Sequence, residues 1–124
     1  MAKANPILKE LKDAAKGLLF PSESDAPIEA FVWPGAAGPP DEAAVRANAK
    51  VAKGTPVEQV TLADLARTIP EESRGDFLPL FALLGHHLSG TTVFKVGEVT
   101  IDVYVVGRTA DGQYAGVKTE VVET

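Results

Sequence analysis

The sequence predicts a single α+β domain, in which helices pack against a mixed or antiparallel sheet. The last third of the chain contains three runs rich in β-branched residues, separated by Gly97 and by Asp111–Gly112, which are signals for hairpin turns. The first two thirds alternate between helical and extended patterns. The chain has 124 residues, of which 45% are hydrophobic, so we expect one domain with a real core over residues 1–124.

The first helix is predicted from Asn5 to about Lys16. Asn5 is a favoured N-cap residue, Pro6 suits the first helical position, and Gly17 is a stop signal. Between them, apolar residues recur at helical spacing on one side, with charged residues on the other: Ile7, Leu8, Leu11, Ala14 and Ala15.

A strand and a second helix are predicted next. Ile28–Trp33 reads as a strand, and the loop "PGAAGPP" ends it. In "DEAAVRANAK", Asp41 is a candidate N-cap and the alanines favour a helix.

A short strand and a short helix follow. The strand is predicted at Val57–Val60. Thr61, with Asp64 three residues later, resembles a capping box, which predicts a helix from there to about Ile69.

The next segment is predicted as a loop and a buried helix. "PEESRG" reads as the loop. "DFLPLFALLGHHL" is apolar nearly all round, which is typical of a buried helix, with Pro79 tolerated near its first turn.

The three β-branched runs predict a three-stranded antiparallel meander: "TTVFKVG", "EVTIDVYVVGRT" and "QYAGVKTEVVE". Residues on a strand alternate between two faces. In the middle run, Ile101, Val103 and Val105 therefore share one face, and Thr100, Asp102 and Tyr104 share the other.

Composition restricts the function. A net charge of −5 argues against direct nucleic-acid binding and suits docking onto a cationic partner. The absence of cysteine removes thiolate metal sites and cysteine nucleophiles. No apolar run approaches the length of a membrane span, and the start "MAKANPILKE" has no uninterrupted apolar segment after its lysine, unlike a secretory signal, so we expect a soluble, cytoplasmic protein.

Two places carry oxygen-rich groups. In "LFPSESDAP", two prolines flank Ser22-Glu23-Ser24-Asp25, which we call the acidic tip. Such residues often form a solvated turn, but the prolines would also hold Glu23 in a defined direction. At the other end, Glu123 and Thr124 follow a predicted strand directly, and their carboxylates and hydroxyl suit a hard cation such as Mg²⁺.

Two further pairs leave an enzyme or a ligand-binding domain open as an alternative. His86 and His87 point about 100° apart on a helix, so they do not readily share one metal, and a structural role near the helix end is the simpler interpretation. Asp102 and Tyr104 share a strand face, which is more often solvated or covered by a helix than catalytic.

The segments "GLLFPSESDAPIEAFVW" and "KVGEVTIDVYVVGRTADGQYAGVKTEVVET" closely resemble the nuclease A inhibitor (NuiA-like) proteins, small acidic bacterial inhibitors of sugar-non-specific DNA/RNA nucleases. From about Pro34 to Gly90 the chain resembles this family only in its general sequence pattern, without closely similar segments. The resemblance implies a three-layer α/β/α sandwich, which agrees with the element order predicted from the residues: a mixed sheet with a C-terminal three-stranded antiparallel meander.

The resemblance also implies a mechanism. In that family the glutamate of the tip replaces the scissile phosphate, and the C-terminal threonine places its hydroxyl on the nuclease's Mg²⁺. Here these residues are Glu23, flanked by Ser22 and Ser24, and Thr124, preceded by Glu123.

This sequence differs from the family at one further contact with the nuclease. The family has an acidic residue followed by tryptophan in the loop before the long helix. The best match in "IPEESRGDF" is Glu72 followed by Ser73, so the aromatic anchor is missing.

We therefore expect a monomeric inhibitor that binds a nuclease, with no catalytic residue, cofactor, direct nucleic-acid contact or membrane contact of its own. A protein of this fold that binds a non-nuclease partner is a further alternative.

Overall fold

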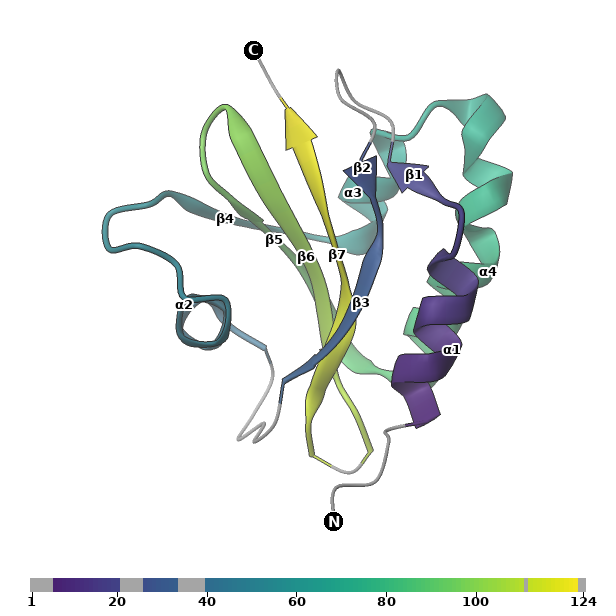
Figure 1. Cartoon of the computed structure of the whole chain (residues 1–124), viewed down its shortest axis with the longest axis horizontal. Helices are drawn as coiled ribbons and strands as arrows, with labels where there is room; N and C mark the ends of the chain where they lie inside the picture. Colours follow the sequence, from purple (N-terminus) through teal and green to yellow (C-terminus); the bar gives the residue numbers. More distant parts are fainter. Residues whose placement is uncertain (1–5, 21–25, 34–39, 111, 123–124) are drawn as a thin grey trace.

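The computed structural model describes residues 6–20, 26–33, 40–110 and 112–122 (Figure 1). Its helices are α1 (Pro6–Ala15), α2 (Glu42–Asn48), α3 (Leu62–Arg67) and α4 (Glu71–His87). Its strands are β1 (Leu19–Phe20), β2 (Ala26–Pro27), β3 (Glu29–Trp33), β4 (Val57–Val60), β5 (Ser89–Val96), β6 (Thr100–Arg108) and β7 (Tyr114–Val122).

The central sheet has five strands in the order β3-β7-β6-β5-β4, and every neighbouring pair is antiparallel. The meander of β5, β6 and β7 is confirmed. The mixed sheet that we expected is wrong for the described strands, because β3 adds to the meander at β7 and β4 adds to it at β5, each in the antiparallel sense. A separate two-stranded pair, β1–β2, was not expected.

Helices cover both faces of the central sheet (Figure 1). On one face, α1, α3 and α4 enclose a large apolar core that includes Leu11, Leu65 and Leu84. On the other face, α2 covers a smaller core, in which Val45 packs with Phe94 and Tyr104. This arrangement agrees with the α/β/α layering that the resemblance implies.

Local capping signals in the sequence are confirmed. The Asp41 carboxylate accepts a hydrogen bond of 2.8 Å from the backbone N–H of Ala44 at the start of α2. At α3 the Asp64 N–H donates to the Thr61 hydroxyl at 3.0 Å, and the Thr61 N–H donates to the Asp64 carboxylate at 3.2 Å, which completes the predicted capping box. After α1, Gly17 takes a positive φ of 81°, as a helix stop does.

The predictions for α4 are wrong in two respects. The helix begins at Glu71, so "PEESRG" is not a loop: acidic residues stabilise the first turn of a helix, and Arg74 donates a hydrogen bond of 2.9 Å to the carbonyl of Ile69. Pro79 therefore lies inside the helix and not near its first turn. The helix is also not buried all round, because Leu78 is 63% exposed.

The alternation predicted for the middle run of the meander is confirmed. Ile101, Val103 and Val105 face the large core, and Tyr104 faces the smaller one. Within the described segments, no helix has the length and apolar character needed to cross a membrane.

Candidate functional site

The base of the acidic tip is held by backbone pairing and by β7. Ser22, Glu23 and Ser24 lie outside the described residues, but the strands on either side of them pair as Leu19↔Pro27 and Phe20↔Ala26. The buried hydroxyl of Thr119 on β7 donates a hydrogen bond of 3.1 Å to the Pro27 carbonyl. A two-stranded pair is weak alone, so this contact and the direct continuation of β2 into β3 tie the pair to the central sheet.

The last strand continues past the base of the tip toward the end of the chain. Glu123 and Thr124 also lie outside the described residues, while β7 is described as far as Val122, which pairs with Thr100. At about 3.3 Å per residue, Val122 lies roughly 10 Å along the strand from Thr119. The β1–β2 pair and the end of β7 therefore share one end of the molecule (Figure 1).

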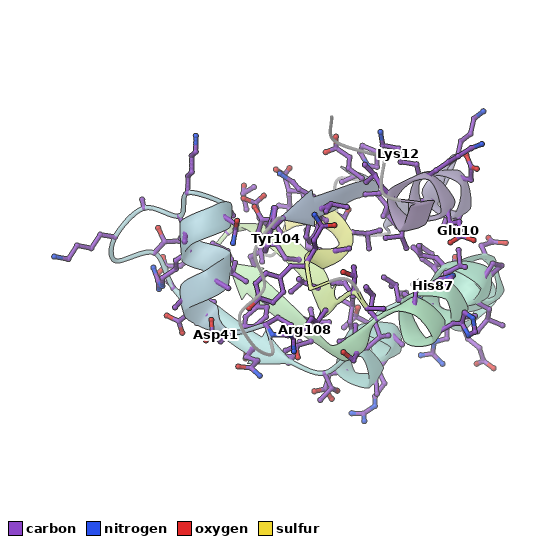
Figure 2. All side chains as sticks on the ribbon, turned by 90° about the horizontal axis from the view of Figure 1, so that it is seen from below. Glu10, Lys12, Asp41, His87, Tyr104 and Arg108 are labelled. Atoms are coloured by element: carbon purple, nitrogen blue, oxygen red, sulfur yellow. The ribbon has the colours of Figure 1, made fainter. Side chains whose placement is uncertain are left out.

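The first turn of α4 lies at the same end. Its last turn contacts α1 through His87, whose Nε2 lies 3.1 Å from a carboxylate oxygen of Glu10, and the two side chains point toward each other in Figure 2. The first turn, which carries the exposed Glu72, is therefore at the opposite end of α1, where α1 leads into β1 (Figure 1).

A polar recess of about 210 Å³ lies beside the base of the tip, on the sheet face that α2 only partly covers. Glu29, Asp102, Lys118 and Glu120 contribute to its walls, together with Ala26 and Pro27 of β2. Sequence reasoning did not find this group, although Lys118 and Glu120 are two residues apart on one strand and so share a face.

The carboxylates of this recess repel one another. Asp102 and Glu120 are directly opposite on β6 and β7, and like charges in that position destabilise a sheet. Lys118 places its Nζ 5.6 Å from the centre of the Tyr104 ring. Among the described residues, no ion pair is formed by Glu29, Asp102 or Glu120. A cationic group from a partner would therefore find acceptors there.

The pair Asp102 and Tyr104 does not converge on one site. Tyr104 lies between the sheet and α2 (Figure 2), against the rings of Phe31 and Trp33 at centroid distances of 6.1 and 5.7 Å. Burial raises the pKa of the Tyr104 hydroxyl above its ordinary value, and Asp102 adds to that rise while Lys118 opposes it. The phenol is therefore neutral at neutral pH and is part of the core.

His86 and His87 also do not form a metal site with their surroundings. Their rings meet edge to face at 4.7 Å, and His87 is engaged by Glu10. No group of three potential metal ligands is found in the part of the chain that the structure describes.

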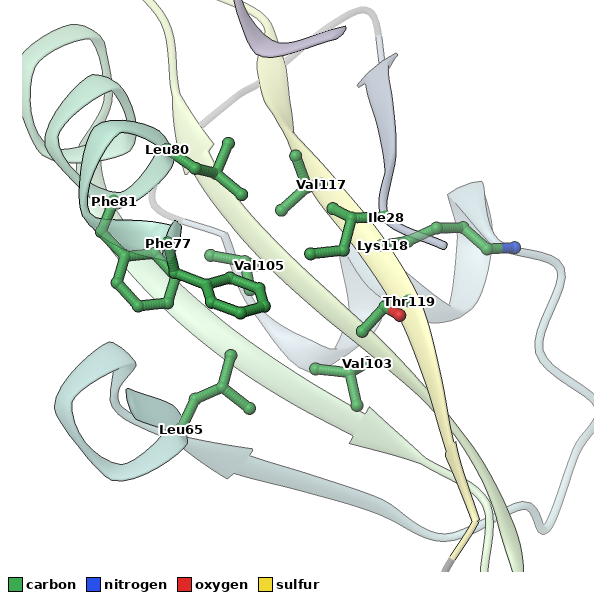
Figure 3. Close-up of a pocket in the computed structure, with 10 residues that line it drawn as sticks. All are labelled: Ile28, Leu65, Phe77, Leu80, Phe81, Val103, Val105, Val117, Lys118 and Thr119. Atoms are coloured by element: carbon green, nitrogen blue, oxygen red, sulfur yellow. The ribbon is translucent and has the colours of Figure 1, made fainter. Parts of the chain in front are cut away.

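A second hollow opens into the large core (Figure 3). Phe77, Phe81 and Val103 contribute to its mostly apolar lining, and its volume is about 20 Å³. That is room for about one water molecule, far less than a small-molecule site needs. This hollow is a packing feature.

Comparison with protein families gives a match over nearly all of the chain. A protein-family model described as "Nuclease A inhibitor-like protein" matches residues 5–124. The match includes the segment from Pro34 to Gly90. No curated protein matches the chain.

Proposed function

The chain belongs to the nuclease A inhibitor-like family, and we propose that it inhibits a sugar-non-specific DNA/RNA nuclease by occupying that enzyme's active site. One observation carries the proposal beyond family membership. The base of the acidic tip, the end of β7 and the first turn of α4 share one end of the molecule (Figure 1). One protein partner could therefore contact all three at once.

Glu23 acts in this proposal as a phosphate mimic, with Ser22 and Ser24 beside it. A nuclease site that holds a phosphodiester presents cationic groups, and these accept a carboxylate in its place. Because β1 and β2 pair on either side of the tip and β2 is bonded to β7, the tip begins and ends at anchored positions. An anchored loop loses less entropy on binding than a free one.

Thr124 approaches the nuclease's own metal ion with its hydroxyl, and Glu123 adds a carboxylate beside it. A hydroxyl oxygen is a hard ligand that can replace water on Mg²⁺. The support is the course of β7, which remains paired with β6 as far as Val122, two residues before Thr124. The metal belongs to the nuclease in this mechanism.

The recess that includes Glu29, Asp102 and Glu120 lies beside the base of the tip and extends this surface, and exposed Glu72 in the first turn of α4 adds another carboxylate at the same end of the molecule. A nuclease attracts nucleic acid with positive charge. The acidic inhibitor, with a net charge of −5, would be attracted by the same field, which speeds encounter and favours the right orientation.

The first test replaces Glu23 by Gln, which keeps the shape of the side chain and removes its charge. We expect the inhibition constant against a purified sugar-non-specific nuclease to rise at least about tenfold, because loss of a desolvated charged contact costs about 2 kcal/mol or more. Glu58→Gln is the matched control, since Glu58 is exposed on β4 at the other edge of the sheet. Equal inhibition by Glu23→Gln and the parent would refute the phosphate mimic.

The second test concerns the metal contact. Thr124→Val removes the hydroxyl and keeps the shape, whereas Thr124→Ser keeps the hydroxyl. We expect weaker inhibition from the valine variant alone, with the melting temperature unchanged in both. Full inhibition by the valine variant would refute the hydroxyl contact, and loss of inhibition in the serine variant alone would assign the contact to the methyl group.

A further inference from the structure

The outward face of α4 is apolar and exposed. Phe77, Leu80 and Leu84 point into the large core, while Leu78 is 63% exposed. No charged residue occurs between Asp76 and His86. A helix at the surface of a protein normally carries charged or polar residues on its outward face, so this face has the composition of one that is covered.

Four exposed residues form a line along this face: Gly75, Leu78, Ala82 and Gly85, which we call the α4 stripe. Their spacing of three, four and three residues is that of a coiled-coil seam, which keeps the residues aligned along a second helix. A Cβ atom built on Gly75 or Gly85 meets nothing within 4 Å. A partner helix can therefore approach the backbone closely.

The two ends of α4 are complementary to each other. Glu71 and Glu72 lie in its first turn, and His86 and His87 lie in its last. When two α4 helices pair in opposite directions, Glu71 of each lies beside His86 of the other, where a carboxylate can accept a hydrogen bond from an imidazole. Antiparallel pairing also places the positive end of each helix dipole beside the negative end of the other.

From this complementarity we propose that the α4 stripe is a contact between two copies of this chain, with their α4 helices antiparallel. The midpoint between Glu71 and His86 falls between Leu78 and Pro79. The two-fold axis passes there, so Leu78 of one copy packs against Leu78 and Pro79 of the other. The same register places Gly75 opposite Ala82, two small residues that allow close approach.

The contact is small. An α-helix of 17 residues spans about 25 Å, and one helix pair buries less than a standard interface. The association is therefore weak and depends on concentration. It revises the monomer that we expected from the sequence, and it does not depend on the inhibitor function.

The first experiment is sedimentation velocity from micromolar to millimolar concentration. We expect the weight-average mass to rise from 13.0 kDa toward twice that value for the parent chain. We expect Leu78→Glu to remain at the monomer mass, because a charge would be buried at the two-fold axis. Val99→Glu is the matched control, since Val99 is 58% exposed in the turn between β5 and β6, and it should associate as the parent does.

Ala82→Arg is a second variant that should also remain monomeric, and circular dichroism verifies that each variant is folded. A parent chain that stays at 13.0 kDa throughout would overturn the proposal. So would association that both stripe variants retain. Loss of nuclease inhibition in Leu78→Glu, with a monomeric parent, would instead assign the stripe to the nuclease.

The second experiment tests the direction of pairing, and it uses the absence of cysteine from the chain. Leu78→Cys should form a disulfide-linked dimer under mild oxidation, because the two residues lie at the axis. Gly85→Cys should not, because the two positions are about 20 Å apart in the antiparallel pair. Linkage through Gly85→Cys alone, or equally through both, would overturn the antiparallel arrangement.

Discussion

The two faces of the central sheet differ in how they are covered. One face lies under α1, α3 and α4, and its core includes fully buried leucines from α1 and α4, such as Leu11 and Leu84. The other face lies under the seven residues of α2, whose single buried side chain is Val45. Beyond α2 this second face stays open, and its strands carry Glu29, Asp102 and Glu120.

Under the proposed function, one face mainly stabilises the fold and the other mainly binds the partner. The free energy of folding comes mainly from apolar burial, so the face under three helices contributes most of it. The open end of the other face carries like charges, which are unfavourable for the fold and favourable for a cationic partner. Substitutions on the two faces should therefore separate stability from inhibition.

The largest expected effect is in the large core. Leu84→Ala should lower the free energy of unfolding by about 3 kcal/mol, because Leu84 is fully buried and its truncation leaves a cavity. Val45→Ala, at an equally buried site under α2, should cost about 2 kcal/mol. Denaturant unfolding measures both. A larger loss of unfolding free energy in Val45→Ala would mean that the face under α2 contributes more to stability than the face under three helices.

A smaller effect is expected in the recess, and it acts on inhibition. The double variant Asp102→Asn and Glu120→Gln removes two adjacent charges, so nuclease inhibition should weaken about fivefold, equivalent to roughly 1 kcal/mol. The melting temperature should stay the same or rise slightly, because the repulsion between β6 and β7 is relieved. A clear fall in melting temperature with full inhibition would show that the recess is structural.

The smallest expected effect is a pH dependence of stability, and it comes from Tyr104 in the smaller core under α2. Burial raises the pKa of Tyr104 above the ordinary value of about 10, so the folded chain holds this proton more tightly than the unfolded chain. Its contribution to stability is complete below pH 10 and is lost as the pH rises through the raised pKa.

Absorbance of tyrosinate against pH, with Tyr104→Phe as the reference, measures this titration. The difference between the two curves should have its midpoint above pH 10. A midpoint at or below the ordinary value would show that the ring is open to water and that α2 does not seal its core.

Sequence reasoning succeeded where the signal is local. The capping box of Thr61 and Asp64, the N-cap Asp41 and the turns of the meander depend on residues a few positions apart. It failed where distant segments decide. The β1–β2 pair has only two residues in each strand and is hydrogen-bonded to β7. That hydrogen bond joins Thr119 to Pro27, which are 92 positions apart in the sequence.

The predicted site divides in the same way. The sequence and its resemblance identified Glu23, Thr124 and Glu72, and their roles stay predictions, since Glu23 and Thr124 lie outside the described residues. The recess of Glu29, Asp102 and Glu120 was missed because it combines three strands. Its residues are ordinary surface charges until the sheet brings them together.

By itself, the sequence determined the α+β class, the meander, most element boundaries and the family, because period, caps and turn residues act over a few residues. Only the tertiary structure decided the direction of β3 and β4 in the sheet and which side of α4 is buried. It alone also brought the base of the tip beside β7. Strand direction and helix orientation depend on contacts between segments far apart in the chain, and an apolar pattern all round α4 does not say which side faces the core.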